Sequence, residues 1–191
     1  MLTKTAAGRK PGLNDRGNRM NRWEELMVFY GHAHRNPINI LIHVVGVPVI
    51  VCAALTPAAW LRLFDMGGVS VTGAWVVGAA GLLFYFTLDV AFAAWFTPIM
   101  IALVYAADQI AAGSFQSSAT FAVAGFFGGY GAQFIGHAIE GRKPSLFTSV
   151  WKSMVTAPLF FVAEIAKVLG LRKDLFTKVD AEIARRDTVS A

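Results

Sequence analysis

The chain has 191 residues, of which 55% are hydrophobic and 15% are charged, with a formal net charge of +5 and a mean hydropathy of +0.53. A soluble globular domain of this length needs more charged surface, so the composition excludes that class and favours a membrane protein. Seven of the 17 Lys and Arg residues lie within residues 1–35, nine follow Glu140, and only Arg62 lies between. This distribution indicates contact with anionic lipid headgroups rather than with nucleic acid.

The polar N-terminal region precedes an expected amphipathic helix. Residues 1–20 contain no apolar stretch typical of a cleavable signal peptide, so we expect a disordered basic tail that is not removed. Asn21 and Glu24 have the spacing of a helix capping box. Apolar residues follow at helical spacing over residues 23–30, which predicts a helix lying on the membrane. The same face continues to His34, which we therefore expect to point toward the membrane.

Several long apolar stretches predict membrane spans. An Asn-Pro pair at 36–37 marks a helix start, and the charge-free run over residues 38–61 matches the roughly 20 residues needed to cross hydrocarbon. Residues 69–107 are long enough for two spans joined by a turn at Asp89. A further span covers residues 121–139, where several glycines allow neighbouring helices to approach closely. The sequence therefore predicts an all-α polytopic membrane bundle with about four spans.

The C-terminal part of the chain is less continuously apolar. Residues 146–169 carry an apolar stripe that charged residues and Pro158 interrupt, which favours an amphipathic helix pair, interfacial or partly inserted, over a fifth span. We interpret residues 172–191 as a charged tail and residues 21–171 as a single membrane-embedded domain. An even number of spans places both basic ends on one side, which the positive-inside rule makes cytoplasmic. The membrane is expected to be the bacterial inner membrane, or the endoplasmic reticulum in a eukaryote.

Histidines gather at the cytoplasmic boundary of the predicted spans. His34 precedes the first span, His43 lies about two turns into it, and His137 ends the fourth, followed by Glu140. Imidazoles with a carboxylate suit non-haem iron, zinc or manganese, and the single cysteine, Cys52, excludes a cysteine-rich site. The alternative is that each histidine is an interfacial residue with a hydrogen-bonded partner.

Other polar residues surround these histidines. Asn39 and Gln133 each lie four residues before a histidine on the same helix face, where they would orient the ligating imidazoles. Arg142 and Lys143 are either ordinary cytoplasmic flanking charges or ligands of a substrate carboxylate or phosphate. His32 falls off the apolar face, so we expect a solvated histidine there.

Two stretches resemble the signature of a known membrane family, the 2-hydroxy fatty acid dioxygenases, over about residues 20–170. One lies at the start of the first span and the other at the end of the fourth. They read His34-Arg35-Asn36-Pro37-Ile38-Asn39-Ile40-Leu41-Ile42-His43 with Gly46-Val47-Pro48, and Gln133-Phe134-Ile135-Gly136-His137 with Glu140 and Lys143-Pro144.

The resemblance implies an Fe²⁺-dependent enzyme that uses O₂ to shorten a 2-hydroxy fatty acid by one carbon, with the acyl tail among the spans. His34, His43 and His137 match the family's histidines and would hold the iron. Asn39 and Glu140 match its flanking polar positions, to which we assign a catalytic role. The iron would keep open positions for O₂ and for the substrate's hydroxyl and carboxylate oxygens.

Other functions stay open at this point. Arg142 or Lys143 would attract the substrate carboxylate, a hypothesis that rests on their proximity to His137 in the sequence. A histidine-metal lipid hydroxylase or hydrolase is one alternative, and a membrane scaffold or transporter is another. The spans show no evident inverted repeat and are almost free of charge at their centres, which argues against a transporter.

Overall fold

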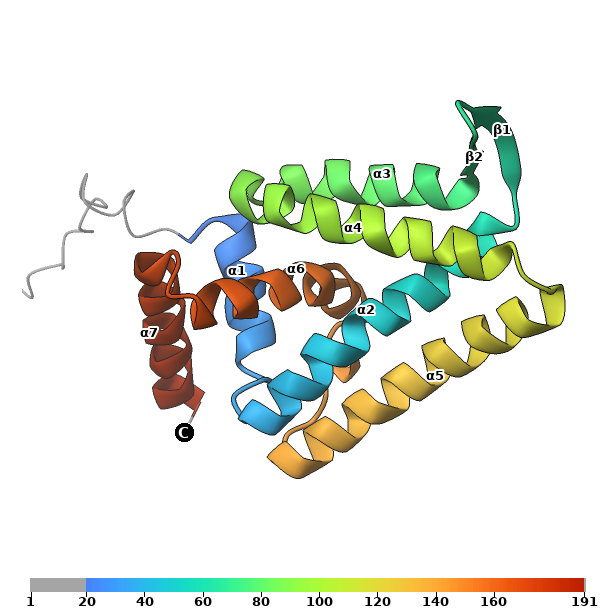
Figure 1. Ribbon diagram of the computed structural model, residues 1–191. Coiled ribbons are helices and arrows are strands. Elements are labelled where there is room, and N and C mark those ends of the chain that lie inside the picture. Colours follow the sequence, from blue (N-terminus) through green and yellow to red (C-terminus); the bar gives the residue numbers. More distant parts are fainter. Residues whose placement is uncertain (1–19, 191) are drawn as a thin grey trace, which may run out of the picture.

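The computed structural model describes residues 20–190, which form seven α-helices, one 3₁₀ helix and one two-stranded hairpin (Figure 1). The expected all-α fold is therefore confirmed, whereas the basic tail expected over residues 1–20 lies almost wholly outside the described residues. In chain order the elements are α1 (Arg22–Gly31), α2 (Pro37–Ala59), β1 (Arg62–Met66), β2 (Val69–Thr72), α3 (Gly73–Phe86), α4 (Val90–Ala111), α5 (Phe115–Glu140), η2 (Ser145–Phe147), α6 (Val150–Val168) and α7 (Lys173–Ser190).

Helices α2 and α5 lie side by side, with α2 in the middle of the bundle and α5 along its edge (Figure 1). Glycines of α5 allow this close approach. A Cβ atom added to Gly129 would lie 2.5 Å from Cγ1 of Ile50, and one added to Gly136 would lie 2.3 Å from Oδ1 of Asn39. A side chain at either position would force the neighbouring side chain or the helices to shift, so the role expected for these glycines is confirmed.

Helices α3 and α4 pack together along one side of the bundle (Figure 1). The turn expected at Asp89 is confirmed, because its side chain accepts a hydrogen bond from the backbone N–H of Phe92 and caps α4. However, α3 has only 14 residues, because residues 69–72 pair with residues 62–66 in an antiparallel hairpin. This hairpin was not predicted. Its signal in the sequence is the pair Gly67-Gly68, whose φ angles are 58° and 84°, followed by a segment in which three of four residues, 69–72, are β-branched.

Two helices, α2 and α4, are long and apolar enough to cross a membrane on their own. Helices α6 and α7 would add a third span if this pair, bent by 114°, counts as one. By length and composition, two or three spans among the described residues qualify, fewer than the four expected from the sequence. The reason is that α3 is short and α5 is rich in glycine and polar residues.

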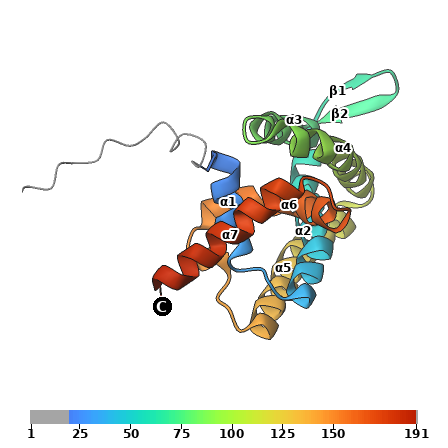
Figure 2. The same ribbon diagram turned by 90° about the vertical axis from the view of Figure 1, so that its left-hand side faces the viewer.

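Helices α1, α6 and α7 gather on one side of the α2–α5 pair (Figure 2). Trp23 and Met27 of α1 are 0% and 2% exposed, and the Trp23 ring packs edge-on against Phe92 of α4. Lys178 of α7 forms a 2.8 Å ion pair with Glu24. The expectation that this face of α1 rests on the membrane is therefore wrong, because other helices of the protein cover it.

Helix α7 occupies most of the segment that we interpreted as a charged tail. The apolar face of α7 is buried in the same hydrophobic core as residues of α1. This face consists of Leu175, Phe176, Val179 and Ile183. The helix pair expected over residues 146–169 is a 3₁₀ turn followed by the single helix α6.

Candidate metal centre

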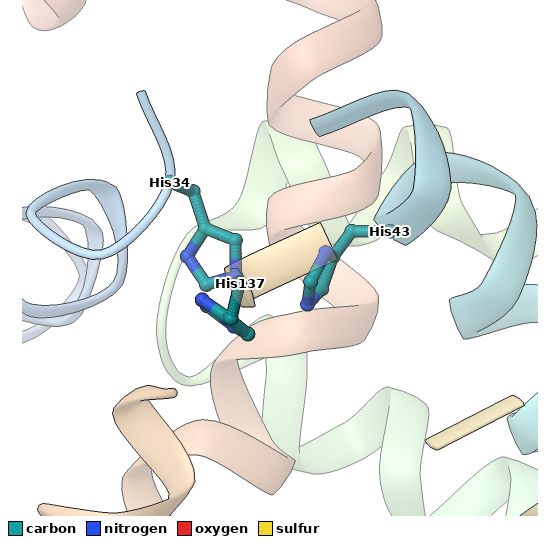
Figure 3. A group of neighbouring side chains, drawn as sticks. All are labelled: His34, His43 and His137. Atoms are coloured by element: carbon teal, nitrogen blue, oxygen red, sulfur yellow. The ribbon is translucent and has the colours of Figure 1, made fainter. Parts of the chain in front are cut away.

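Three histidines, two near the start of α2 and one at the end of α5, meet in the interior (Figure 3). His34 lies in the loop after α1, His43 in the second turn of α2, and His137 in the last turn of α5, and all are at most 4% exposed. Their ring centroids lie 4.3 to 5.0 Å apart. One candidate ligand nitrogen from each ring lies within 4.8 Å of the other two. The structure thus brings together the three histidines that the sequence singled out as metal ligands.

Backbone carbonyls determine the tautomer of two of these rings. Nδ1 of His34 donates to the carbonyl of Tyr30 at 2.7 Å, and Nδ1 of His43 donates to the carbonyl of Asn39 at 2.9 Å. A carbonyl only accepts, so Nδ1 carries the hydrogen and Nε2 keeps its lone pair. Nε2 of His34 is buried and has no hydrogen-bond partner among the described residues. A buried, unpaired lone pair beside two other imidazoles fits a bound metal ion.

The surroundings keep His34 uncharged. Burial is the main reason why its pKa is lowered to about 2, and the neighbouring His43 lowers it further. The Tyr30 ring stacks on the His34 ring with 4.0 Å between centroids. Burial also raises the pKa of Tyr30 above its ordinary value, so that its hydroxyl stays protonated. A neutral imidazole is the form that binds a metal ion.

Asn39 and Glu140 lie behind the imidazoles. The fully buried Asn39 side chain donates to Glu140 at 2.6 Å and lies 3.4 Å from Nδ1 of His137. The other Glu140 oxygen accepts from the backbone N–H of Arg35 at 2.7 Å. Glu140 lies outside the group of converging ligand atoms. Asn39 also accepts a hydrogen bond from the ring of His43 through its backbone carbonyl. Asn39 and Glu140 therefore link α2, the end of α5 and the loop after α1, which are the three segments that contain the histidines.

The remaining residues singled out from the sequence lie farther away. Arg142 donates to the backbone carbonyl of His32 at 2.8 Å, which anchors the loop after α1. Arg142 and Lys143 line a basic groove beside α1 and α6 and not the cavity at the histidines. His32 is exposed, as expected, and contacts Asp187 at 2.8 Å. Gln133, expected to orient an imidazole, forms no hydrogen bond within residues 20–190, so this expectation is wrong.

A mostly apolar cavity of about 260 Å³ adjoins the histidines. His43, His137 and Tyr30 form part of its wall, together with apolar residues of α2, α3, α4, α5 and α6. Neither the cavity nor the position of Tyr30 in its wall was predicted. Tyr30 lies four residues before His34, a spacing that places both on one helix face and that we interpreted as membrane anchoring. An apolar cavity beside buried imidazoles fits a hydrocarbon chain with a polar end.

Comparisons with known proteins agree with the motifs. A family model described as "2-hydroxy-palmitic acid dioxygenase Mpo1-like" matches residues 20–169, a range that contains all three histidines. The 2-hydroxy-palmitic acid dioxygenase MPO1 of Saccharomyces cerevisiae is 27% identical over 164 residues, which cover 83% of this chain and 89% of the yeast protein. No solved structure matches this chain.

Proposed function

The chain belongs to the Mpo1-like family, and from this premise we propose that it is an Fe²⁺-dependent dioxygenase that shortens 2-hydroxy fatty acids by one carbon. The observation that carries the proposal is the buried group of three histidines, one of which keeps an unpaired ring nitrogen. The yeast relative is named for 2-hydroxy-palmitic acid, which belongs to the substrate class that we propose.

His34, His43 and His137 would hold the metal ion. When bound, Fe²⁺ supplies positions for oxygen ligands and the capacity to exchange electrons with O₂. We propose iron rather than zinc, because zinc has no redox chemistry.

We assign positioning roles to the residues behind the histidines. Asn39 and Glu140 hold the rings and the loop in place through the contacts described above. Arg142 supports the same loop through its hydrogen bond to His32. Lys143, in the basic groove, attracts the substrate carboxylate toward the membrane boundary without touching the reacting atoms.

The apolar cavity would hold the acyl tail and exclude water from the reacting end of the substrate. The proposed reaction balances without a further reductant. A 2-hydroxy acid and one O₂ give an acid one carbon shorter, CO₂ and water, since the loss of C1 releases the four electrons that reduce O₂. The chain therefore needs no binding site for a second cofactor.

The apolar helices support a membrane location. We propose that both termini face the cytoplasm, because the basic residues concentrate at both ends of the chain. A reporter fused after Ala191 should be active only on the cytoplasmic side. Activity on the opposite side alone would refute this topology.

The experiment that tests the proposed function is metal analysis of the detergent-purified protein, followed by incubation with 2-hydroxypalmitic acid under air and under argon. We expect stoichiometric iron, O₂ consumption and an acid one carbon shorter under air alone. His43→Ala should abolish all three, whereas His32→Ala should leave them largely intact. A product of unchanged carbon number would indicate a hydroxylase, and turnover under argon would indicate a hydrolase.

A further inference from the structure

Two polar side chains beside the histidines line the cavity without a hydrogen-bond partner among the described residues. Tyr30 is 3% exposed and Gln133 is 8% exposed, and both line the cavity. Within residues 20–190 the hydroxyl of Tyr30 and the amide of Gln133 form no hydrogen bond, since Tyr30 uses only its backbone carbonyl. Neither group is sealed inside the protein, so each is open to a hydrogen-bonding ligand in the cavity.

Both groups lie beside the three histidines. The ring of Tyr30 stacks directly on that of His34. Gln133 precedes His137 by one turn of α5, on the same face of the helix. Its Nε2 lies 3.7 Å from the position that a Cβ atom on Gly46 of α2 would occupy, which places the amide between α2 and α5. The unpaired groups therefore reach the cavity from α1 and from α5, next to the candidate metal ligands.

Their chemistry matches the oxygen-bearing end of a 2-hydroxy acid. A protonated tyrosine donates one hydrogen bond, and an amide donates two and also accepts. A carboxylate only accepts, whereas a hydroxyl both donates and accepts. We propose that Tyr30 and Gln133 bind the carboxylate and the 2-hydroxyl of the substrate and so select free 2-hydroxy acids over their esters and over unsubstituted acids. This inference rests on the proposed function, because it names the groups that recognise the substrate at that site.

The same cavity supplies a matched control. Tyr85 of α3 lines it, is 7% exposed, and has no hydroxyl hydrogen bond among the described residues. Its ring packs against Phe96 of α4, with 5.6 Å between centroids, and not against a histidine. Removing this hydroxyl changes the polarity of the cavity as much as removing that of Tyr30. Of these two tyrosines, Tyr30 is the one whose ring contacts His34 and His43.

The test uses the full chain in detergent, loaded with Fe²⁺ under argon so that no turnover occurs. Dissociation constants are measured for 2-hydroxypalmitic acid, palmitic acid and methyl 2-hydroxypalmitate. Tyr30→Phe and Gln133→Met should each weaken binding of the 2-hydroxy acid roughly tenfold, the usual effect of losing one hydrogen bond to a charged group. In both variants the preference for the 2-hydroxy acid over palmitic acid and over the methyl ester should also decrease. Tyr85→Phe should keep the wild-type preference for the 2-hydroxy acid over the other two ligands, because its ring contacts no histidine. Tyr30→Phe should keep its iron, because the stacked ring remains.

Each contrary result has a defined meaning. If both Tyr30→Phe and Gln133→Met kept the affinity and the preference of the wild type, this inference would be overturned. The proposed function would still stand as long as the wild-type protein turns over the 2-hydroxy acid. Equal weakening for all three ligands, or loss of iron from Tyr30→Phe, would make these residues packing elements and would also overturn it. A wild-type protein that binds none of the ligands would refute the proposed function together with this inference.

Discussion

Replacing Gly136 by Ala tests whether the metal centre depends on the close contact between α2 and α5. The new Cβ atom would lie 2.3 Å from Oδ1 and 3.4 Å from Cα of Asn39. The amide would have to withdraw by about 1 Å to reach ordinary van der Waals contact. Asn39 is fully buried, so the helices or the side chain must shift. Overpacking of this kind costs about 1–3 kcal/mol, partly offset by the roughly 0.5–1 kcal/mol that Ala gains over Gly within a helix.

The same shift should weaken metal binding more than it weakens the fold. Asn39 holds the ring of His43 through its carbonyl and contacts both His137 and Glu140 through its amide. Disturbing a residue that orients metal ligands typically lowers metal affinity about 10- to 100-fold. We therefore expect Gly136→Ala to bind Fe²⁺ at least tenfold more weakly than wild type, with a small loss of thermal stability.

Titration with Fe²⁺ under argon and thermal unfolding in detergent measure the two effects. Gly128→Ala is the matched control, because it lies on the same helix and a Cβ atom there would have no neighbour within 4 Å. This control should keep wild-type affinity and gain slightly in stability. If Gly136→Ala and Gly128→Ala bound iron equally well, Asn39 would not support the metal centre through the helix contact.

Further predictions concern the ligands, the core and the C-terminal helix. His43→Ala and His137→Ala should each abolish bound iron with little loss of folded protein, and wild-type metal content in both would disprove the site. Trp23→Ala, which empties a fully buried position, should lower the free energy of unfolding by about 3–5 kcal/mol, and a change below about 1 kcal/mol in thermal unfolding would contradict the packing of α1. The pKa of Asp187 is lowered chiefly by a hydrogen bond from Arg35. This contact therefore stabilises α7 above the ordinary pKa of 3.8 and is lost as the pH falls through the lower folded value. Proteolytic release of α7 should rise in that range and lose this dependence in Asp187→Asn.

Local spacing in the sequence was enough to predict much of the structure. The capping box at Asn21 and Glu24 is present, and Asn36 caps α2 as expected. These features depend on residues within one helical turn of one another, whose geometry the helix itself determines. The two histidine motifs could be linked because each lies at the boundary of a predicted span, and the structure brings them together.

Contacts between distant residues were not predictable in this way. The bonds from Glu140 to the backbone of Arg35 and from Arg142 to that of His32 join residues more than 100 positions apart. The cavity also depends on contacts between distant residues, since six α-helices contribute to its wall. Periodicity specifies what kinds of residue share a face but not which face of another helix they meet.

Composition and short-range spacing were enough to predict the helical class, the long apolar helices and the three histidines that meet in the interior. Packing between helices was needed to show what covers the apolar face of α1 and where Tyr30 and Gln133 lie. Lipid and protein interior are both apolar, so an apolar stripe predicts burial without indicating which of them buries it. In this chain α6 and α7 turn back onto α1, and their packing places Tyr30 beside His34 rather than in lipid.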